Sequence, residues 1–476
     1  MIRIKLDTES QTPMYEQIYQ SIKLQMKDGI LPPNTKLPST RSLAENLGIS
    51  RNTIDLAYSQ LVSEGYLYPK AKSGYYTSQI SLLTSIDKKN SSALLPIQEH
   101  KKTYQYDFSP FSIDINNFPY NTWRKLSKDA MNECNHHLFL LGDSQGDYEF
   151  RNAISDYLKS FRQVNCNEER IVVGAGADYL LQLLCQILNI AAPSSSIAME
   201  NPTYKRAYRI FSGFHYPVAP IPLDENGINV QELKASSANI AYVTPSHQYP
   251  LGVIMPIQRR LELLQWANDG EERYIIEDDH DSEFRYKGKP IPSLQGIDTK
   301  EKVIYMGTFS RALTPAIRIA YMVLPEKLYR IYKENFYYYS STVSRVDQYI
   351  LTNFIKEGYF ERHFNKMRKI YKSKHDTMLK ALKIFGNSIE IKGENAGLHL
   401  VVSFHTEKNE ASTFYSEEEI LRLAEENSIK LYTLSRHYIH TNNHSHQPTF
   451  LLGYANLLEK DIEQGVAALY SALNER

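Results

Sequence analysis

Residues 274–284 read YIIEDDHDSEF, and this stretch decides the architecture of most of the chain. It opens with a short run rich in β-branched residues, at 274–277, and carboxylates follow where that run ends. Similar runs lie on both sides of it, each followed by a helical pattern, at 171–174, 196–200, 240–243 and 303–306. Short strands that alternate with amphipathic helices predict a parallel α/β sheet with helices on both faces.

The composition is that of an ordinary globular protein. The 476 residues are 42% hydrophobic and 23% charged, with 54 Lys and Arg against 54 Asp and Glu. One core rarely serves a chain of this length, so two or three domains are expected. No apolar run approaches the roughly 18 residues of a membrane span, and no apolar signal core follows Met1. The cytoplasm is therefore the expected location, without membrane contact.

The first 78 residues predict three helices and a two-stranded wing. Ser39 and Ser50 are good N-cap residues, and Gly48 between them ends the first of two closely spaced helices. Two such helices form a helix-turn-helix, and the runs 66–68 and 74–77 predict a hairpin after it. Residues 79–106 are polar without sustained periodicity, which indicates a linker to a large domain at 107–476.

The helix-turn-helix carries side chains suited to double-stranded DNA. The second helix of this motif enters the major groove by its first residues, and backbone amides at a helix N-terminus attract phosphate. The candidate contacts lie at these helix ends and at the wing tip, and they are Lys36, Arg41, Arg51, Asn52, Thr53, Lys70 and Lys72. The alternative is that a small helical unit caps an enzyme and these cations only solvate its surface.

Three short segments of this unit resemble a known family. Residues 37–44 (LPSTRSLA), 47–53 (LGISRNT) and 64–66 (EGY) are similar to the GntR-type winged helix over its whole length. The resemblance implies phosphate and base contacts by Arg41, Arg51 and Thr53. It therefore favours an operator-binding domain over a structural cap.

The large domain contains five segments with a shared resemblance. The turn GAGAD at 174–178 presents amides to an anion at a helix N-terminus, although alone it is a weak signal. The other segments are ENPTYKR at 200–206, TPSHQYP at 244–250, EDDHDSEF at 277–284 and GTFSRALTPAIR at 307–318. Their order and spacing resemble fold type I pyridoxal phosphate-dependent aminotransferases. With the winged helix, the whole chain is similar to MocR-type transcriptional regulators.

The resemblance implies a role for each pocket residue. Asp278 would hold the pyridine nitrogen protonated, and Tyr204 would stack on the ring. The implied cofactor residues are Gly176, Ala177, Tyr204, Asp278, His280, Ser310, Arg311 and Arg318. Arg206 and Arg436 match two family positions that grip a carboxylate, so an amino-acid-like effector is expected. Each residue also has an ordinary structural explanation, such as packing, capping or solvation.

Two positions depart from the family pattern. The family's Schiff-base lysine is Arg311 here, and a guanidinium is neither the nucleophile for an imine nor a base for the α-proton. The family's tyrosine beside the cofactor's phenolic oxygen is His280. Transamination through Arg311 is therefore not expected, and Lys205 is the only substitute amine that suggests itself.

Three interpretations of the pocket remain open. It holds pyridoxal phosphate, its amine form or a preformed adduct with an amino acid, without a covalent bond; it binds another anionic ligand; or it is a scaffold for dimerisation. An aminotransferase with an accessory DNA-binding domain is the opposing class. The resemblance also implies a homodimer in which one chain's winged helix packs near the other chain's large domain.

No metal site is expected from the cysteine pattern. Cys134, Cys166 and Cys185 show no CxxC spacing and no Cys/His cluster, which argues against structural zinc. They are predicted to be inert core thiols.

Overall fold

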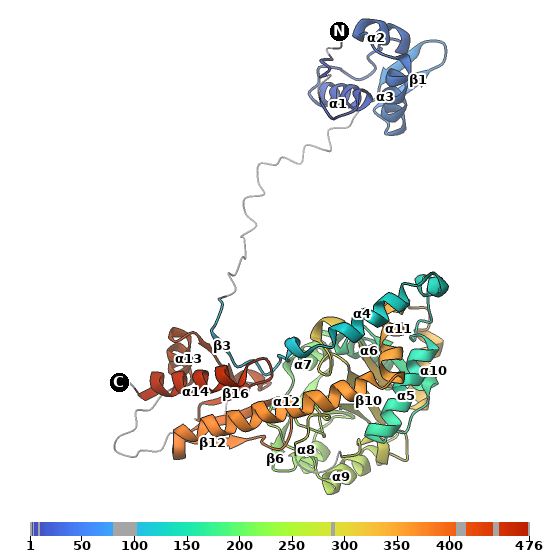
Figure 1. The fold of residues 1–476 in the computed structure, drawn as a ribbon. Helices are drawn as coiled ribbons and strands as arrows, with labels where there is room; N and C mark the ends of the chain where they lie inside the picture. Colours follow the sequence, from blue (N-terminus) through green and yellow to red (C-terminus); the bar gives the residue numbers. More distant parts are fainter. Residues whose placement is uncertain are drawn as a thin grey trace. The chain divides into compact units, whose positions relative to one another are not determined.

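The computed structural model describes residues 2, 4–7, 10–79, 102–286, 291–405, 416–440 and 447–474. The chain forms two compact units, Met1–Lys101 and Lys102–Arg476 (Figure 1). This division falls within the predicted linker 79–106, most of which, residues 80–101, lies outside the described residues.

The small unit is a winged helix-turn-helix. Its elements are α1 (Met14–Lys27), α2 (Thr40–Leu47), α3 (Arg51–Ser63), β1 (Leu67–Lys70) and β2 (Gly74–Thr77). Ser39 and Ser50 accept hydrogen bonds from backbone amides at the starts of α2 and α3, and Gly48 ends α2 with a φ of +66°. Strands β1 and β2 pair antiparallel. The predicted caps, turn and wing are therefore confirmed.

The large unit is organised around an eight-stranded sheet. Its strands, in spatial order, are β4 (Ile171–Gly174), β11 (Ala320–Val323), β10 (Val303–Thr308), β9 (Tyr274–Asp278), β8 (Ile240–Val243), β5 (Ile197–Asn201), β6 (Val218–Asp224) and β7 (Gly227–Ile228). The five predicted strands, β4, β5, β8, β9 and β10, run parallel to one another, but the sheet also contains β11, which pairs antiparallel with β4 and β10, and β7, which pairs antiparallel with β6. The link from β10 to β11 holds no crossover helix, which a parallel return needs.

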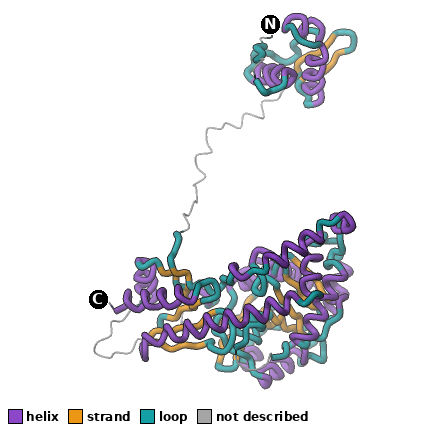
Figure 2. Tube along the Cα trace, viewed as in Figure 1, coloured by secondary structure: helices purple, strands orange, loops and turns teal. Residues whose placement is uncertain are grey.

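Helices cover both faces of this sheet, so that in Figure 2 its strands lie among helices. Alternate strand residues point to opposite faces: Val172 and Ile304 belong to one core, whereas Val173 and Tyr305 belong to the other. The first core includes α6 (Ala177–Ala191), α7 (Lys205–Gly213) and α10 (Glu326–Asn335), and the second α5 (Tyr148–Arg162), α11 (Arg345–Lys356) and α12 (Tyr359–Leu382). None of the described helices is long and apolar enough to cross a membrane.

A smaller sheet lies near the C-terminus. Its order is β12 (Ile389–Lys392), β13 (His399–Phe404), β16 (Thr449–Gly453) and β15 (Tyr432–Thr433), and α13 (Glu417–Glu426) and α14 (Glu459–Asn474) pack on it. Helix α14 packs along α12 (Figure 1). Two short strands follow α13 in the sequence: β14 (Ile429–Lys430) pairs with β3 (Tyr106–Asp107), and β15 pairs with β16.

The cysteine prediction holds for two of three residues. Cys166 and Cys185 are buried, and Cys134 is exposed. Cys134 lies in a 3-10 helix, Glu133–Phe139, of which only Leu138 is buried. It is therefore a surface thiol rather than a core one.

Candidate functional site

Five segments with predicted pocket residues meet at one edge of the large sheet. Strands β5, β8, β9 and β10 run parallel, and their carboxyl ends carry Asn201, Val243, Asp278 and Thr308. Strand β4 reaches the same edge, because Gly174 lies opposite Ala320 of β11 and Ala320 also lies opposite Thr308. Ligands of open α/β sheets bind outside the carboxyl ends of the strands. The predicted pocket residues therefore lie where this fold places its ligands.

A basic corner forms around the N-terminus of α6. Gly176 precedes this helix with a φ of +89°, and a Cβ there would lie 2.7 Å from Nη2 of Arg318. Nη2 of Arg318 donates to Oδ2 of Asp178 at 3.0 Å, and Nη1 of Arg206 donates to the same oxygen at 3.2 Å. Two guanidinium groups and a helix N-terminus thus gather around one carboxylate, an arrangement suited to a phosphate.

Ser310 lies just after β10, two strands away from Gly176. Its amide donates to Oγ1 of Thr308 at 3.1 Å, and Oγ1 of Thr308 donates to the carbonyl of Ile319 at 3.1 Å. Ile319 directly follows Arg318, so these contacts tie the serine's loop to the basic corner. Thr308, to which sequence reasoning gave no role, anchors this connection.

Asp278 ends β9 in a partly buried position next to Tyr242. The Tyr242 hydroxyl donates to its carboxylate. Burial raises the pKa of Asp278 to about 6, although this hydrogen bond opposes the rise. Tyr204 lies half-buried at the N-cap position of α7, and burial raises its pKa to about 12. The charges of Asp178, Asp278, Arg206 and Arg318 all act on the Tyr204 hydroxyl, so it lies near both the basic corner and Asp278.

Arg311 forms a buried, two-pronged ion pair. Its Nε and Nη2 donate to the two carboxylate oxygens of Asp281 at 2.8 and 2.7 Å, and Nη1 donates to the carbonyl of Pro110 at 3.1 Å. The side chain of Arg311 is 14% exposed and that of Asp281 is fully covered. Burial opposes ionisation of Asp281, but the guanidinium holds the pKa of this carboxyl well below its usual range. Sequence reasoning did not foresee this partner.

Tyr249 is the centre of an aromatic group that sequence reasoning also missed. Its ring lies 5.0 Å from that of His280, 5.2 Å from His437, 5.6 Å from His399 and 6.0 Å from Tyr204, measured between ring centroids. Its buried hydroxyl has no hydrogen-bond partner among the described residues. The sequence pointed to this group only through the segment 244–250, in which no individual residue was assigned a role.

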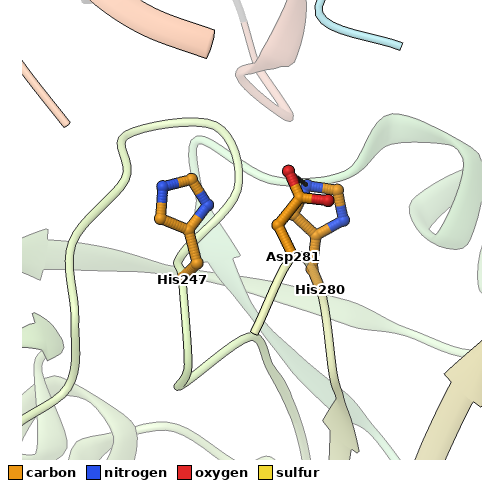
Figure 3. Close-up of side chains that lie close together, drawn as sticks. All are labelled: His247, His280 and Asp281. Carbon is orange, nitrogen blue, oxygen red and sulfur yellow. Dashed lines mark ion pairs between the residues drawn. The ribbon is translucent and has the colours of Figure 1, made fainter. Parts of the chain in front are cut away.

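His247, His280 and Asp281 lie close together, as Figure 3 shows. The rings of the two histidines stack at 6.2 Å, and Nε2 of His280 lies 3.5 Å from Oδ2 of Asp281. Burial lowers the pKa of both His247 and His280 to about 4, so both imidazoles are neutral at physiological pH.

The two arginines predicted to grip a carboxylate lie on neighbouring segments. Arg206 is on the first turn of α7, and Arg436 is an exposed residue of the 3-10 helix Ser435–His437. The amide of Thr203 donates to the carbonyl of His437 at 3.0 Å, which holds these segments together. No contact between the two guanidinium groups exists in the described structure.

Lys205 turns away from the pocket. Its ammonium donates to the carbonyl of Ile439 at 3.3 Å and lies 5.1 Å from the centroid of the Tyr208 ring. Burial and the nearby Arg209 lower its pKa. This geometry weakens the suggestion that Lys205 replaces the family lysine.

The small unit places its predicted DNA contacts on an open surface. Arg51 and Asn52 begin α3 and are exposed, and Thr53 follows half-exposed. Arg51 and Arg41 pair only with carboxylates one turn along their own helices, Asp55 at 3.4 Å and Glu45 at 3.1 Å. Surface pairs of this kind are weak, so both arginines are available to phosphates or bases.

The three lysines predicted to contact DNA gather at the wing of the small unit. Lys72 lies at the turn between β1 and β2 with a φ of +58°, and Lys70 lies 5.7 Å from the centroid of the Tyr76 ring. Lys36 forms an isolated bridge with Tyr76 of β2. A third cation thus lies beside the wing, although it precedes α2 in the sequence.

Each of the two units matches a known protein family. Residues 14–76 match the family model described as bacterial regulatory proteins, gntR family, and residues 111–469 match aminotransferase class I and II. The large unit also resembles the crystal structure of Pyrococcus horikoshii kynurenine aminotransferase in complex with PMP. The TM-score is 0.67 with 23% identity, over 83% of this chain and 99% of that one.

Relatives that contain both units are regulators by name. An uncharacterized HTH-type transcriptional regulator, YdeL, from Bacillus subtilis is 39% identical over 97% of this chain and 96% of its own length. The probable rhizopine catabolism regulatory protein MocR of Rhizobium meliloti is 31% identical over 98% of this chain and 95% of its own. The chain therefore belongs to the MocR-type transcriptional regulators, in which a GntR-family DNA-binding domain precedes an aminotransferase class I and II domain.

Proposed function

We propose that the large domain is a ligand sensor that holds pyridoxal phosphate or its amine form without a covalent bond, together with an amino-acid-like effector. Ligand capture then changes how the winged helix binds its operator. The observation that carries this proposal is Arg311, which replaces the family lysine and is held in a two-pronged ion pair with Asp281.

The residues present suit the cofactor in two places. The basic corner of Gly176, Ala177 and Arg318 offers amides and a guanidinium to the phosphate, and the φ of +89° at Gly176 favours glycine there. Asp278 offers a partly buried carboxylate to the pyridine nitrogen. When bound, pyridoxal phosphate supplies an electrophilic aldehyde and an electron-withdrawing ring.

The remaining cofactor contacts would come from the ring's surroundings. Tyr204 lies near both anchoring groups and would stack on the ring. The hydroxyl of Tyr249 is buried without a hydrogen-bond partner among the described residues, so it can meet a polar ring substituent. Ser310 is tied to the basic corner through Thr308 and adds a hydroxyl donor.

The position of Arg311 argues against turnover. Each of its nitrogens already donates to Asp281 or to the carbonyl of Pro110, and a guanidinium remains protonated at physiological pH. Lys205 is engaged by the carbonyl of Ile439. Neither Arg311 nor Lys205 is therefore placed to bond covalently with the cofactor's aldehyde.

The effector would be recognised by its carboxylate. Arg206 and Arg436 lie on segments joined by the bond between Thr203 and His437, and both side chains are exposed. Arg206 pairs with Asp178 in a partly exposed contact that an effector carboxylate can replace. We expect a homodimer in which this capture favours one arrangement of the DNA-binding domains, which needs a difference in ligand affinity between arrangements.

The test is DNA binding by the full-length chain, measured by fluorescence anisotropy at one stated salt concentration. The probe is a site selected by this chain from random-sequence DNA, with and without pyridoxal phosphate and a panel of amino acids. The proposal predicts that one amino acid shifts the affinity for DNA, and that Arg206→Ala removes the shift. Arg209→Ala, an exposed arginine on the same helix, is the matched control and should keep it.

Two results would contradict the proposal. DNA affinity that is indifferent to every ligand would indicate a scaffold without a sensing role. Sustained product formation from an amino acid and a keto acid, abolished by Asp278→Ala, would indicate an aminotransferase with an accessory DNA-binding domain.

A further inference from the structure

His247 has an unsatisfied imidazole in the interior of the large unit. Its side chain is completely buried, and neither ring nitrogen has a hydrogen-bond partner among the described residues. Nε2 of His280 is likewise buried without such a partner. Buried polar atoms are nearly always paired, so three unpaired nitrogens in one cluster indicate that a binding partner completes it.

The donor atoms of this cluster lie close to one another. One nitrogen from each of His247 and His280 and one oxygen from Asp281 all lie within 4.8 Å of each other (Figure 3). Ligand atoms on a tetrahedral zinc ion lie about 3.4 Å apart, given bond lengths of about 2.1 Å. Small side-chain rotations would therefore bring the three donors onto a single ion.

The donor types also suit a transition metal. Both imidazoles are neutral, which is the form that binds a metal, and a carboxylate is the common third ligand of zinc sites that keep one position open. His247 and His280 follow β8 and β9, two adjacent strands, so the sheet itself positions them. Two histidines and one carboxylate form a recognised donor set that linear spacing does not reveal.

Arg311 is the group that most opposes a cation here. It uses two of the roughly four acceptor positions of the Asp281 carboxylate, which leaves others for an ion. Carboxylates that bind metals are commonly held by such hydrogen bonds. The other charged groups acting on His280 are the carboxylates of Asp281 and Asp279, so the cluster is not cationic overall.

We propose that His247, His280 and Asp281 form a binding site for one zinc ion. The proposal goes beyond ligand sensing and does not depend on it, because zinc binding is measured without pyridoxal phosphate or an amino acid. The ion would supply a partner to one nitrogen of each imidazole and would lie beside Arg311.

The experiment is calorimetric titration of the full-length, chelator-treated chain with zinc chloride, followed by titration with cobalt(II) and visible absorption. We expect one saturable site per chain and a cobalt spectrum typical of nitrogen and oxygen ligands. His247→Gln and His280→Tyr should each weaken zinc binding by more than about 100-fold, since even an outer partner of a ligand is worth about 10- to 100-fold. His280→Tyr introduces the tyrosine of the family pattern, so the fold should tolerate it.

His375→Gln is the matched control. His375 is also a buried histidine with an unpaired Nε2, but it packs on Tyr286 and Tyr454 outside the cluster. Zinc affinity should be unchanged in this variant. No saturable binding, or binding that survives both His247→Gln and His280→Tyr, would overturn the proposal, and so would an equal loss in His375→Gln. Thermal melting of each variant separates lost binding from lost folding.

Discussion

The winged helix and the aminotransferase-like domain differ in how their arginines are exposed and paired. In the small unit Arg41 and Arg51 are 81% and 67% exposed and pair only with neighbours on their own helices. In the large unit Arg311 and Arg162 are nearly covered and form two-pronged pairs with Asp281 and Asp279. Exposed pairs contribute little and exchange partners readily, whereas a buried pair cannot lose one member cheaply. DNA phosphates can therefore replace the carboxylates of the exposed pairs, whereas the buried pairs fix the shape of the pocket.

Removing one member of the buried pair should have the largest effect. Asp281→Ala leaves the Arg311 guanidinium buried without its counter-ion, which typically costs about 3 to 5 kcal/mol. Urea unfolding, followed by tryptophan fluorescence because both tryptophans lie in the large unit, should show this loss. Replacing both residues by apolar ones, Asp281→Leu with Arg311→Met, should recover much of it. An equal loss in the double variant would mean that packing, rather than charge, makes the site sensitive.

Replacing the carboxylate of Asp278 should stabilise the fold and abolish cofactor binding. Burial raises the pKa of Asp278 from 3.8 to about 6, so the folded state favours the neutral form. The free energy of unfolding is therefore highest when Asp278 is protonated, and it falls as the pH rises from about 4 to about 6. Asp278→Asn avoids the charge, so its stability advantage should grow from pH 4 to pH 8 and reach about 3 kcal/mol, while pyridoxal phosphate binding is lost.

Unfolding of both forms across this pH range is the measurement. The exposed Glu463→Gln should show no such pH-dependent advantage. An advantage for Asp278→Asn that does not change with pH would contradict the assignment of a buried charge.

Among the exposed arginines, Arg51→Ala should weaken DNA binding by about 1 to 3 kcal/mol, or roughly 5- to 150-fold. Ligand affinity and stability should hardly change, because the pair with Asp55 is exposed. Fluorescence anisotropy at several salt concentrations measures the change in DNA affinity. Arg330→Ala removes the same kind of helical pair, with Glu326, from the large unit and should leave DNA binding intact. Loss of ligand binding in Arg51→Ala would point to misfolding.

The smallest expected effect is a gain. Glu45→Gln removes the carboxylate that competes with DNA for Arg41, so affinity for DNA should rise about twofold, with stability changed by less than about 0.5 kcal/mol. Glu326→Gln, which frees Arg330 in the same way, should have no effect on DNA binding. Weaker DNA binding in Glu45→Gln would mean that the pair with Glu45 positions Arg41.

The same contrast explains what could be predicted from sequence. Caps such as Ser39 and Ser50 act within a few residues, so the winged helix was foreseen almost element by element. The direction of β11 depends on strand pairing that periodicity does not encode. Asp281 lies thirty residues from Arg311 and was one of several carboxylates in its segment, so only folding identified it as the partner. Likewise, the grouping of His247 with His280 required two strands to lie side by side.

The most direct test of the sensor proposal is calorimetric titration of the purified chain with pyridoxal phosphate, followed by borohydride reduction and intact mass measurement. Borohydride makes an imine between the cofactor and a protein amine permanent. We predict saturable binding with no increase in mass, because Arg311 is held by Asp281 and offers no amine. A stable mass increase at one lysine would contradict non-covalent binding, and no binding at all would contradict the cofactor pocket itself.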